Sequence, residues 1–164
     1  TVVAARSSAA KEVVSVAVGA ENATLTLEVA GALTSADTEQ MAEYARTPWS
    51  AATVASRHSL TVPSRRLDDL LEEHAVAPGF DVLIVDVEGC EAQVFAGFEL
   101  ERWRPTLMIW ELSDTHPDLR LHRDASVAIA RSIVENGYRI VYKDAINTVF
   151  LRDDGDAAAH HPSR

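Results

Sequence analysis

Acidic side chains cluster in the segment Asp86-Val87-Glu88-Gly89-Cys90-Glu91, which directly follows a short apolar run. A further acid, Glu111, follows a second apolar run. Carboxylates can take up a proton in acid–base catalysis, or bind a hard divalent cation through oxygen. Burial at a strand end could also raise the pKa of Glu111, as functional carboxyl groups often require. The candidate catalytic residues are therefore Asp86, Glu88, Glu91 and Glu111.

The same acids also have a structural interpretation. The dipole of a helix favours acids near its N-terminus, so the acids of segment 86–91 could surround a solvated turn and Glu91 could cap a helix. Glu111 could form a salt bridge with an arginine. Spacing alone favours neither interpretation.

Other reactive side chains give weaker signals. His116 lies in an expected loop before a proline, and His160-His161 lies in the small, polar stretch after residue 153. No His and Asp arrangement accompanies Cys90, so we expect that side chain to pack as a small residue. No metal site built from His or Cys is expected. The side chains expected in the core include Trp49, Trp103 and Trp110.

The surrounding elements alternate between strand and helix, which indicates an α/β layered sheet. The expected strands cover residues 13–18, 24–29, 60–62, 82–85, 106–112, 138–142 and 147–151. The expected helices cover residues 64–74, 92–103 and 124–136. Ligands of such sheets bind outside the carboxyl ends of the strands. If strands 82–85 and 106–112 are parallel neighbours, Asp86 and Glu111 share one edge of the sheet.

Several local details can be checked. The continuous apolar run Val82–Val85 predicts a strand buried on both faces. Ser64 is expected to cap the first helix, and Gly137 to form the left-handed C-terminal cap of the third. The last two strands are close enough in sequence to pair antiparallel. The expected core positions of the third helix are Val127, Ile129, Ile133 and Val134.

Composition narrows the class of protein. The 164 residues suffice for one domain with a real core, and 47% apolar with 24% charged residues argues against disorder. Fifteen basic and 25 acidic residues give a net charge of −10, which disfavours a nucleic acid partner. The single cysteine excludes an intrachain disulfide. No apolar run approaches the roughly 20 residues of a membrane span, and residues 1–10 lack a signal-peptide core, so we expect a cytoplasmic location and no membrane partner.

Residues 1–153 are expected to form a single domain, and residues 154–164 a flexible tail. The stretch 31–57 is rich in Ala, Ser and Thr and lacks clear periodicity. We therefore expect an insertion or loop there, with a short helix over residues 36–45.

Several motifs, taken in order, resemble the FkbM family of methyltransferases. They are Leu67-Asp68-Asp69-Leu70-Leu71, the strand from Asp81 to Glu91 that ends in Asp-x-Glu-Gly-x-Glu, Val94-Phe95-Ala96-Gly97, and Arg104-Pro105 leading into Ile109-Trp110-Glu111. Ala17-Val18-Gly19 resembles the third strand of the family, and Gly137-Tyr138 fits its closing strands. The resemblance covers roughly Val13 to Leu151.

The resemblance implies a Rossmann-like class I methyltransferase sheet. It also implies S-adenosylmethionine-dependent O-methylation of a hydroxyl on a small molecule, sugar or natural product. The cofactor contacts that it implies are Ala17, Val18 and Asp86, and it favours a catalytic role for Asp86 and Glu88. The family's first strand with a Gly-rich turn, and its second strand with a ribose-binding acid, are not matched. The sheet is therefore expected to be truncated at its N-terminus. Ile84 stands where the family commonly has Lys.

More than one function stays open. In a methyltransferase, Asp86 could act as a base, or the acids could hold a divalent cation. The chain could also be a catalytically silent binding or scaffolding domain, or a metal-dependent transferase or hydrolase with a similar acidic strand end. The truncation predicts weak or absent S-adenosylmethionine binding by the isolated chain. It also predicts an exposed apolar sheet edge and association into homo-oligomers.

Overall fold

The computed structural model describes residues 3–7 and 10–153. The expected tail, which includes His160-His161, lies outside the described residues. The strands are β1 (Val3–Ser7), β2 (Ala10–Val14), β3 (Ala17–Gly19), β4 (Ala23–Val29), β5 (His58–Arg66), β6 (Val82–Val85), β7 (Leu107–Glu111), β8 (Tyr138–Lys143) and β9 (Asn147–Arg152). The α-helices are α1 (Thr38–Arg46), α2 (Ala51–Ala55), α3 (Leu67–Glu73), α4 (Glu91–Ala96), α5 (Leu100–Trp103) and α6 (Arg123–Glu135). Two 3-10 turns are η1 (Gly31–Leu33) and η2 (Ser113–Thr115).

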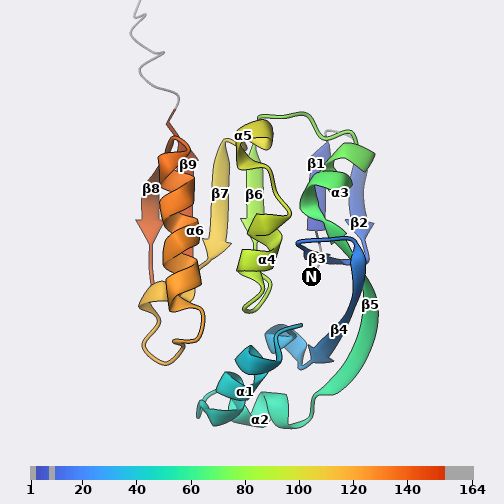
Figure 1. Cartoon of the computed structure of the whole chain (residues 1–164), viewed down its shortest axis with the longest axis vertical. Helices are drawn as coiled ribbons and strands as arrows, with labels where there is room; N and C mark the ends of the chain where they lie inside the picture. Colours follow the sequence, from blue (N-terminus) through green and yellow to red (C-terminus); the bar gives the residue numbers. More distant parts are fainter. Residues whose placement is uncertain (1–2, 8–9, 154–164) are drawn as a thin grey trace, which may run out of the picture.

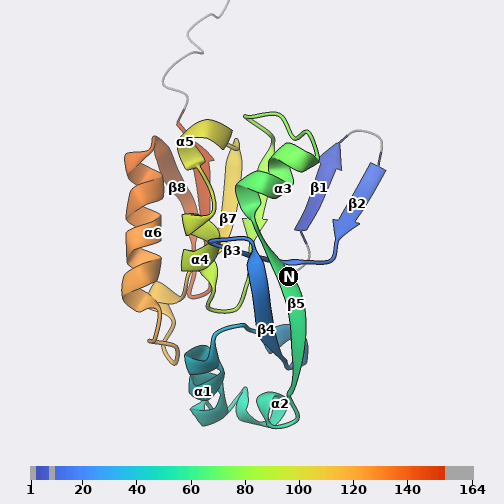
Figure 2. The ribbon, with the colours of Figure 1, turned by 45° about the vertical axis from the view of Figure 1, so that its right-hand side comes forward.

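The strands divide into separate sheets (Figures 1 and 2). A three-stranded sheet has the order β3-β5-β4, a four-stranded sheet has the order β6-β7-β9-β8, and β1 pairs with β2. β6 runs parallel to β7, whereas β9 pairs antiparallel with both β7 and β8. The expected α/β class and the antiparallel closing pair are confirmed.

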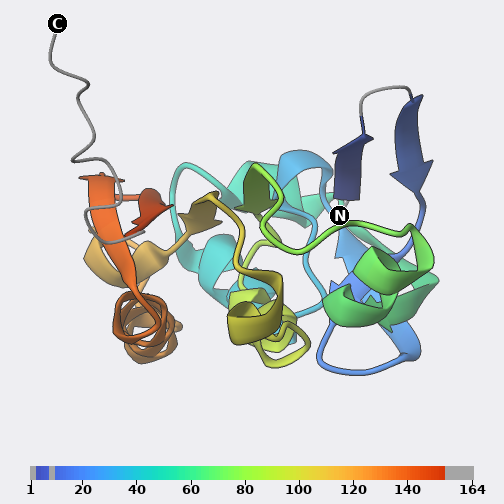
Figure 3. The same ribbon diagram turned by 90° about the horizontal axis from the view of Figure 1, so that it is seen from above.

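Helices cover one face of the four-stranded sheet, where α4 and α6 lie on the same side (Figure 3). Met108, Trp110 and Phe150 point into this layer and are fully buried. On the other face Val82 is 48% exposed and Ile84 is 65% exposed. The expectation that this strand is buried on both faces was therefore wrong: its apolar run faces a helix layer only through Leu83 and Val85.

Other local expectations also required correction. Ser64 caps no helix, because it lies inside β5, paired with Ala17 and Ala23. The expected first strand is divided between β2 and β3. In α6, Ile129 and Ile133 are buried as expected, but Val127 and Val134 are exposed because the helix packs through a narrower stripe. The left-handed cap at Gly137 is confirmed by its φ of +83°.

A close backbone contact joins the helix layer to the end of β3. The expected helix over residues 92–103 is broken between α4 and α5, and Gly97 in this break touches the end of β3. A Cβ atom on Gly97 would lie 2.3 Å from the carbonyl oxygen of Gly19. The Asp68 N–H also donates to the Gly97 carbonyl at 3.1 Å. Only a residue without a side chain fits this contact.

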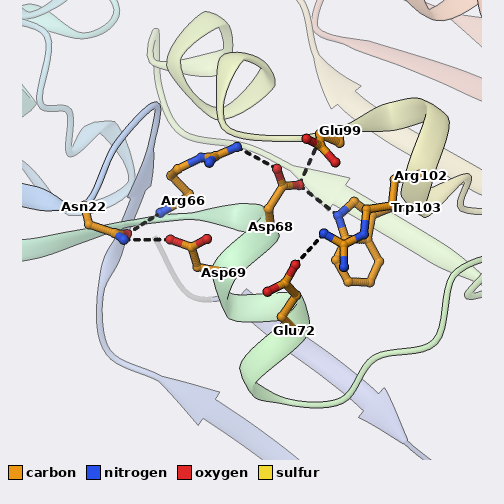
Figure 4. Close-up of polar contacts among 8 residues, drawn as sticks. All are labelled: Asn22, Arg66, Asp68, Asp69, Glu72, Glu99, Arg102 and Trp103. Carbon is orange, nitrogen blue, oxygen red and sulfur yellow. Dashed lines mark hydrogen bonds and ion pairs between the residues drawn. The ribbon is translucent and has the colours of Figure 1, made fainter.

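Asp68, from the Leu-Asp-Asp motif, is a buried structural residue (Figure 4). One carboxylate oxygen, Oδ1, accepts from Trp103 Nε1 at 2.8 Å and from the Glu99 N–H at 2.9 Å. The other oxygen, Oδ2, accepts from Arg66 at 2.8 Å. Asp68 thereby fixes α3 against α5, which explains this part of the motif through packing.

Residues 31–57, which we call the cap, are largely helical. α1 confirms the helix expected over residues 36–45, and Asp37 begins it by accepting from the N–H groups of Glu39 and Gln40. The cap lies below the ends of β6 and β7 in Figure 1. A small second core stabilises it, built from Ala30, Met41, Tyr44, Val54 and Leu119. Among the described residues, no helix is long and apolar enough to cross a membrane.

Candidate functional site

Three of the predicted acids come together at the ends of β6 and β7. The parallel pairing of these strands places Asp86 and Glu111 at the same edge, as expected. One carboxylate oxygen from each of Asp86, Glu88 and Glu111 lies within 4.8 Å of the others. Asp86 is exposed, whereas Glu88 and Glu111 are half-buried. We call these three residues the acidic cluster.

Two acids of the cluster, Glu88 and Glu111, favour their protonated forms. Burial raises the pKa of Glu111 to about 9, helped by a hydrogen bond with Asp86 and by the charge of Glu88. At neutral pH Glu111 is therefore protonated. Burial also raises the pKa of Glu88, although a hydrogen bond from Tyr44 opposes this effect. The cluster can thus accept a proton or a cation.

Glu91 occupies a different position and closes the turn that carries the cluster. It is 7% exposed, and its Oε1 accepts from the N–H groups of Val87 and Gly89 at 3.3 Å each. Burial raises the pKa of Glu91 to about 7 despite these hydrogen bonds. Glu88 and Gly89 both have left-handed backbone, with φ of +51° and +94°. Such strain at a non-glycine residue persists only where its surroundings hold it.

The cap holds this turn, which sequence reasoning missed. The Tyr44 hydroxyl donates to Glu88 Oε2, and Ser35 Oγ donates to the Glu88 carbonyl at 2.6 Å. Gln40 covers Gly89 so closely that a Cβ there would lie 2.9 Å from Gln40 Cγ. Tyr44 is 44 residues from Glu88 in sequence, and its position in the short amphipathic helix α1 was the only available signal.

The cap also contacts the loop that follows Glu111. Glu43 Oε1 accepts from the N–H groups of Arg120 and Leu121 at 2.9 and 3.3 Å. The ring of Trp49 lies 5.9 Å from that of Tyr44 and 6.1 Å from that of His116, centroid to centroid. Trp49 is 50% exposed, so the expectation of a core residue was wrong for it, whereas Trp103 and Trp110 are buried.

The predicted cofactor contacts Ala17 and Val18 line a pocket of about 380 Å³ on another side of the same turn. Val87, Cys90 and Gln93 form part of its wall. Asp86, the third predicted contact, is not among the residues that line this pocket.

The surroundings of the remaining candidates, Cys90 and His116, indicate structural roles. Burial raises the pKa of Cys90, so its thiol stays protonated and is a poor nucleophile. Nδ1 of His116 accepts from the N–H groups of Asp118 and Leu119 at 3.1 Å each, which stabilises a turn.

Comparison with known proteins identifies the family. The family model described as the Methyltransferase FkbM domain matches residues 3–140. No curated protein and no solved structure matches the chain. The matched segment spans most of the chain and includes both acidic strand ends, the pocket residues and the cap. The chain therefore belongs to the FkbM methyltransferase family.

Proposed function

We propose that the chain carries the acceptor-activating part of an S-adenosylmethionine-dependent O-methyltransferase. The observation that supports this proposal most is the acidic cluster at the ends of two parallel strands, in a chain of the FkbM family. Open α/β sheets bind their ligands at this edge. The acceptor is a hydroxyl compound such as a sugar, a natural product or another small molecule.

The acidic cluster suits the proton chemistry of this reaction. S-adenosylmethionine, when bound, supplies the methyl group. A hydroxyl oxygen that accepts a methyl group must lose its proton, and a carboxylate placed beside it can accept that proton. Asp86 is exposed enough to meet the acceptor. Glu111, whose pKa burial raises to about 9, lies beside Asp86 in the same cluster.

Part of a cofactor site is present in the described residues. The pocket beside Ala17 and Val18 has mostly small or apolar walls, which suit a flat ring such as adenine. In residues 3–7 and 10–153, no G-x-G turn joins a strand to a helix. The described residues therefore fit the adenine part of the cofactor, whereas the methionine part needs groups from elsewhere. We propose that the sheet that carries this adenine site is Rossmann-like.

Asp86→Asn tests the proposed base. Asn has nearly the shape of Asp but cannot accept the proton, so we expect turnover to fall about a hundred- to ten-thousand-fold, with little change in cofactor affinity. The measurement is transfer of a labelled methyl group by a protein that joins this chain to a Gly-rich cofactor turn. Asp81→Asn is the matched control, because Asp81 is an exposed acid at the opposite end of β6. Normal turnover by folded Asp86→Asn protein would refute the assignment.

A divalent cation is the alternative means of activating the hydroxyl. Carboxylate oxygens within 4.8 Å of one another could bind such an ion, which would then stabilise the alkoxide. A chelator distinguishes the two routes: it should abolish turnover by the metal route and leave the base route unaffected. A catalytically silent scaffold would show no methyl transfer with or without added ions.

A further inference from the structure

Tyr44 connects the cap to the acidic cluster. The side chain is 2% exposed, and its hydroxyl donates to Glu88 Oε2. Burying a hydroxyl costs free energy unless it finds a partner, and a charged partner gives a strong hydrogen bond. The contact therefore ties a cap residue firmly to a carboxylate of the proposed site.

The conformation of Glu88 requires support from its surroundings. The residue has a left-handed backbone, and its carboxylate lies beside those of Asp86 and Glu111. The charge of Asp86 repels the Glu88 carboxylate, so a freely rotating Glu88 side chain would turn away. Ser35 Oγ donates to the carbonyl oxygen of Glu88 and so holds its backbone, whereas the Tyr44 hydroxyl holds the Glu88 carboxylate itself.

We infer that Tyr44 is a positioning residue, whose hydroxyl holds the Glu88 carboxylate in the acidic cluster and so makes the cap part of the acceptor site. This inference rests on the proposed function and deepens it. The cap contacts the loops after both acidic strand ends, so an acceptor that reaches Asp86 approaches beside the cap. The site takes an acceptor that is uncharged or cationic near the reacting hydroxyl, because three crowded carboxyl groups repel phosphate and carboxylate.

Tyr44→Phe in the full chain tests the positioning role, because it removes the hydroxyl and keeps the packed ring. Tyr138→Phe is a matched control. Tyr138 is 3% exposed, and its hydroxyl donates to the Pro105 carbonyl at 2.7 Å, near the opposite ends of the strands. Both variants lose a buried hydroxyl contact, so an effect of general destabilisation should be common to both.

Two spectroscopic readouts report on the turn without any acceptor. The first is amide hydrogen exchange of residues 87–91. The second is the side-chain carboxyl ¹³C resonance of Glu88, assigned by its loss in Glu88→Gln. In Tyr44→Phe we expect at least tenfold faster exchange and a shifted carboxyl resonance, with neither change in Tyr138→Phe. Unchanged values in Tyr44→Phe, or equal changes in both variants, would overturn the inference.

A double mutant links the contact to catalysis. In the methyl-transfer assay we expect Tyr44→Phe to lower turnover about tenfold, but to have little further effect in a Glu88→Gln background, because coupled residues are non-additive. If the two substitutions lowered turnover independently, so that their effects multiplied in the double mutant, Tyr44 would not act through Glu88. If no variant transfers methyl groups while the spectroscopic changes appear, the proposed function fails and the positioning contact stands.

Discussion

At the scale of single residues, burial of carboxyl groups dominates the proposed site. Glu111 ends an apolar strand, so both its burial and its carboxyl neighbours follow from the fold. The pKa of about 9 means that the folded chain keeps a proton that an unfolded chain releases at an ordinary carboxyl pKa. The folded state therefore binds more protons than the unfolded state in the window between these two values.

This difference predicts that stability falls as pH rises. By linkage, the contribution of Glu111 is fully present below its unfolded pKa and is lost as pH rises through about 9. The raised pKa of Glu91 acts in the same direction, so its contribution to stability is lost as pH rises through about 7. We therefore expect the melting temperature to drop by several degrees between about pH 7.5 and about pH 9, since about 1 kcal/mol corresponds to roughly 2–4 °C in a chain of this size.

Thermal unfolding of Glu111→Gln followed across this pH range checks the assignment. The variant should show a clearly smaller drop, because the amide does not titrate. Glu135→Gln, at an exposed acid in α6, should keep the full drop. Identical pH profiles for both variants and the unchanged chain would show that Glu111 ionises normally.

Sequence patterns predicted those residues of the site whose positions depend on local strand periodicity. Asp86 and Glu111 were placed correctly at one edge, because apolar runs marked β6 and β7 and their parallel pairing followed from the α/β order. Tyr44 was missed because its contact with Glu88 crosses 44 residues and depends on how the cap packs. No local pattern encodes such a contact.

At the scale of elements, tertiary pairing overrode local signals. Ser64 has the type of a helix cap, but β5 pairs with both β3 and β4 and continues through this position to Arg66. The helix predicted over 92–103 has good local periodicity, yet it breaks at Gly97, where the backbone of β3 approaches. Strand and helix existence were therefore predictable here, whereas boundaries set by neighbouring elements were not.

Gly97→Ala should destabilise the chain by about 3 kcal/mol, at the upper end for overpacking, since a backbone oxygen 2.3 Å from the new Cβ cannot rotate away. Gly19→Ala offers a graded comparison at the glycine on the other side of this contact. Its Cβ would meet Ser64 Oγ at 3.0 Å, and that side-chain atom can move. Denaturant unfolding should rank Gly97→Ala well below Gly19→Ala in stability, and equal losses would show that the contact is not tight.

At the scale of the whole molecule, one face of the four-stranded sheet is apolar and open. Val82 and Ile84 of β6 are exposed there, at the edge of the sheet beside β7. Sheets with parallel strands are normally covered on both faces. Exposed apolar strands of this kind associate with other surfaces.

We therefore expect the chain to form homo-oligomers at high concentration and to bind a hydrophobic dye. Ile84→Arg should shift sedimentation toward the monomer and weaken dye binding by severalfold, because it places a charge in the middle of the open face. Val134→Arg, at an exposed position on α6, should leave association unchanged. A clean monomer without dye binding would contradict this prediction.

The division of the apolar interior into two cores has a consequence for how the molecule opens. The larger core runs from Val18 of β3 through α3, α4 and the four-stranded sheet to Phe150, so these parts should unfold together as one cooperative unit. The cap has its own smaller core. Regions with fewer buried apolar side chains open at lower free energy, so brief detachment of the cap should precede global unfolding. Each such event would release Glu88 and uncover the acidic cluster while the main sheet stays folded, giving large acceptors an intermittent route of entry.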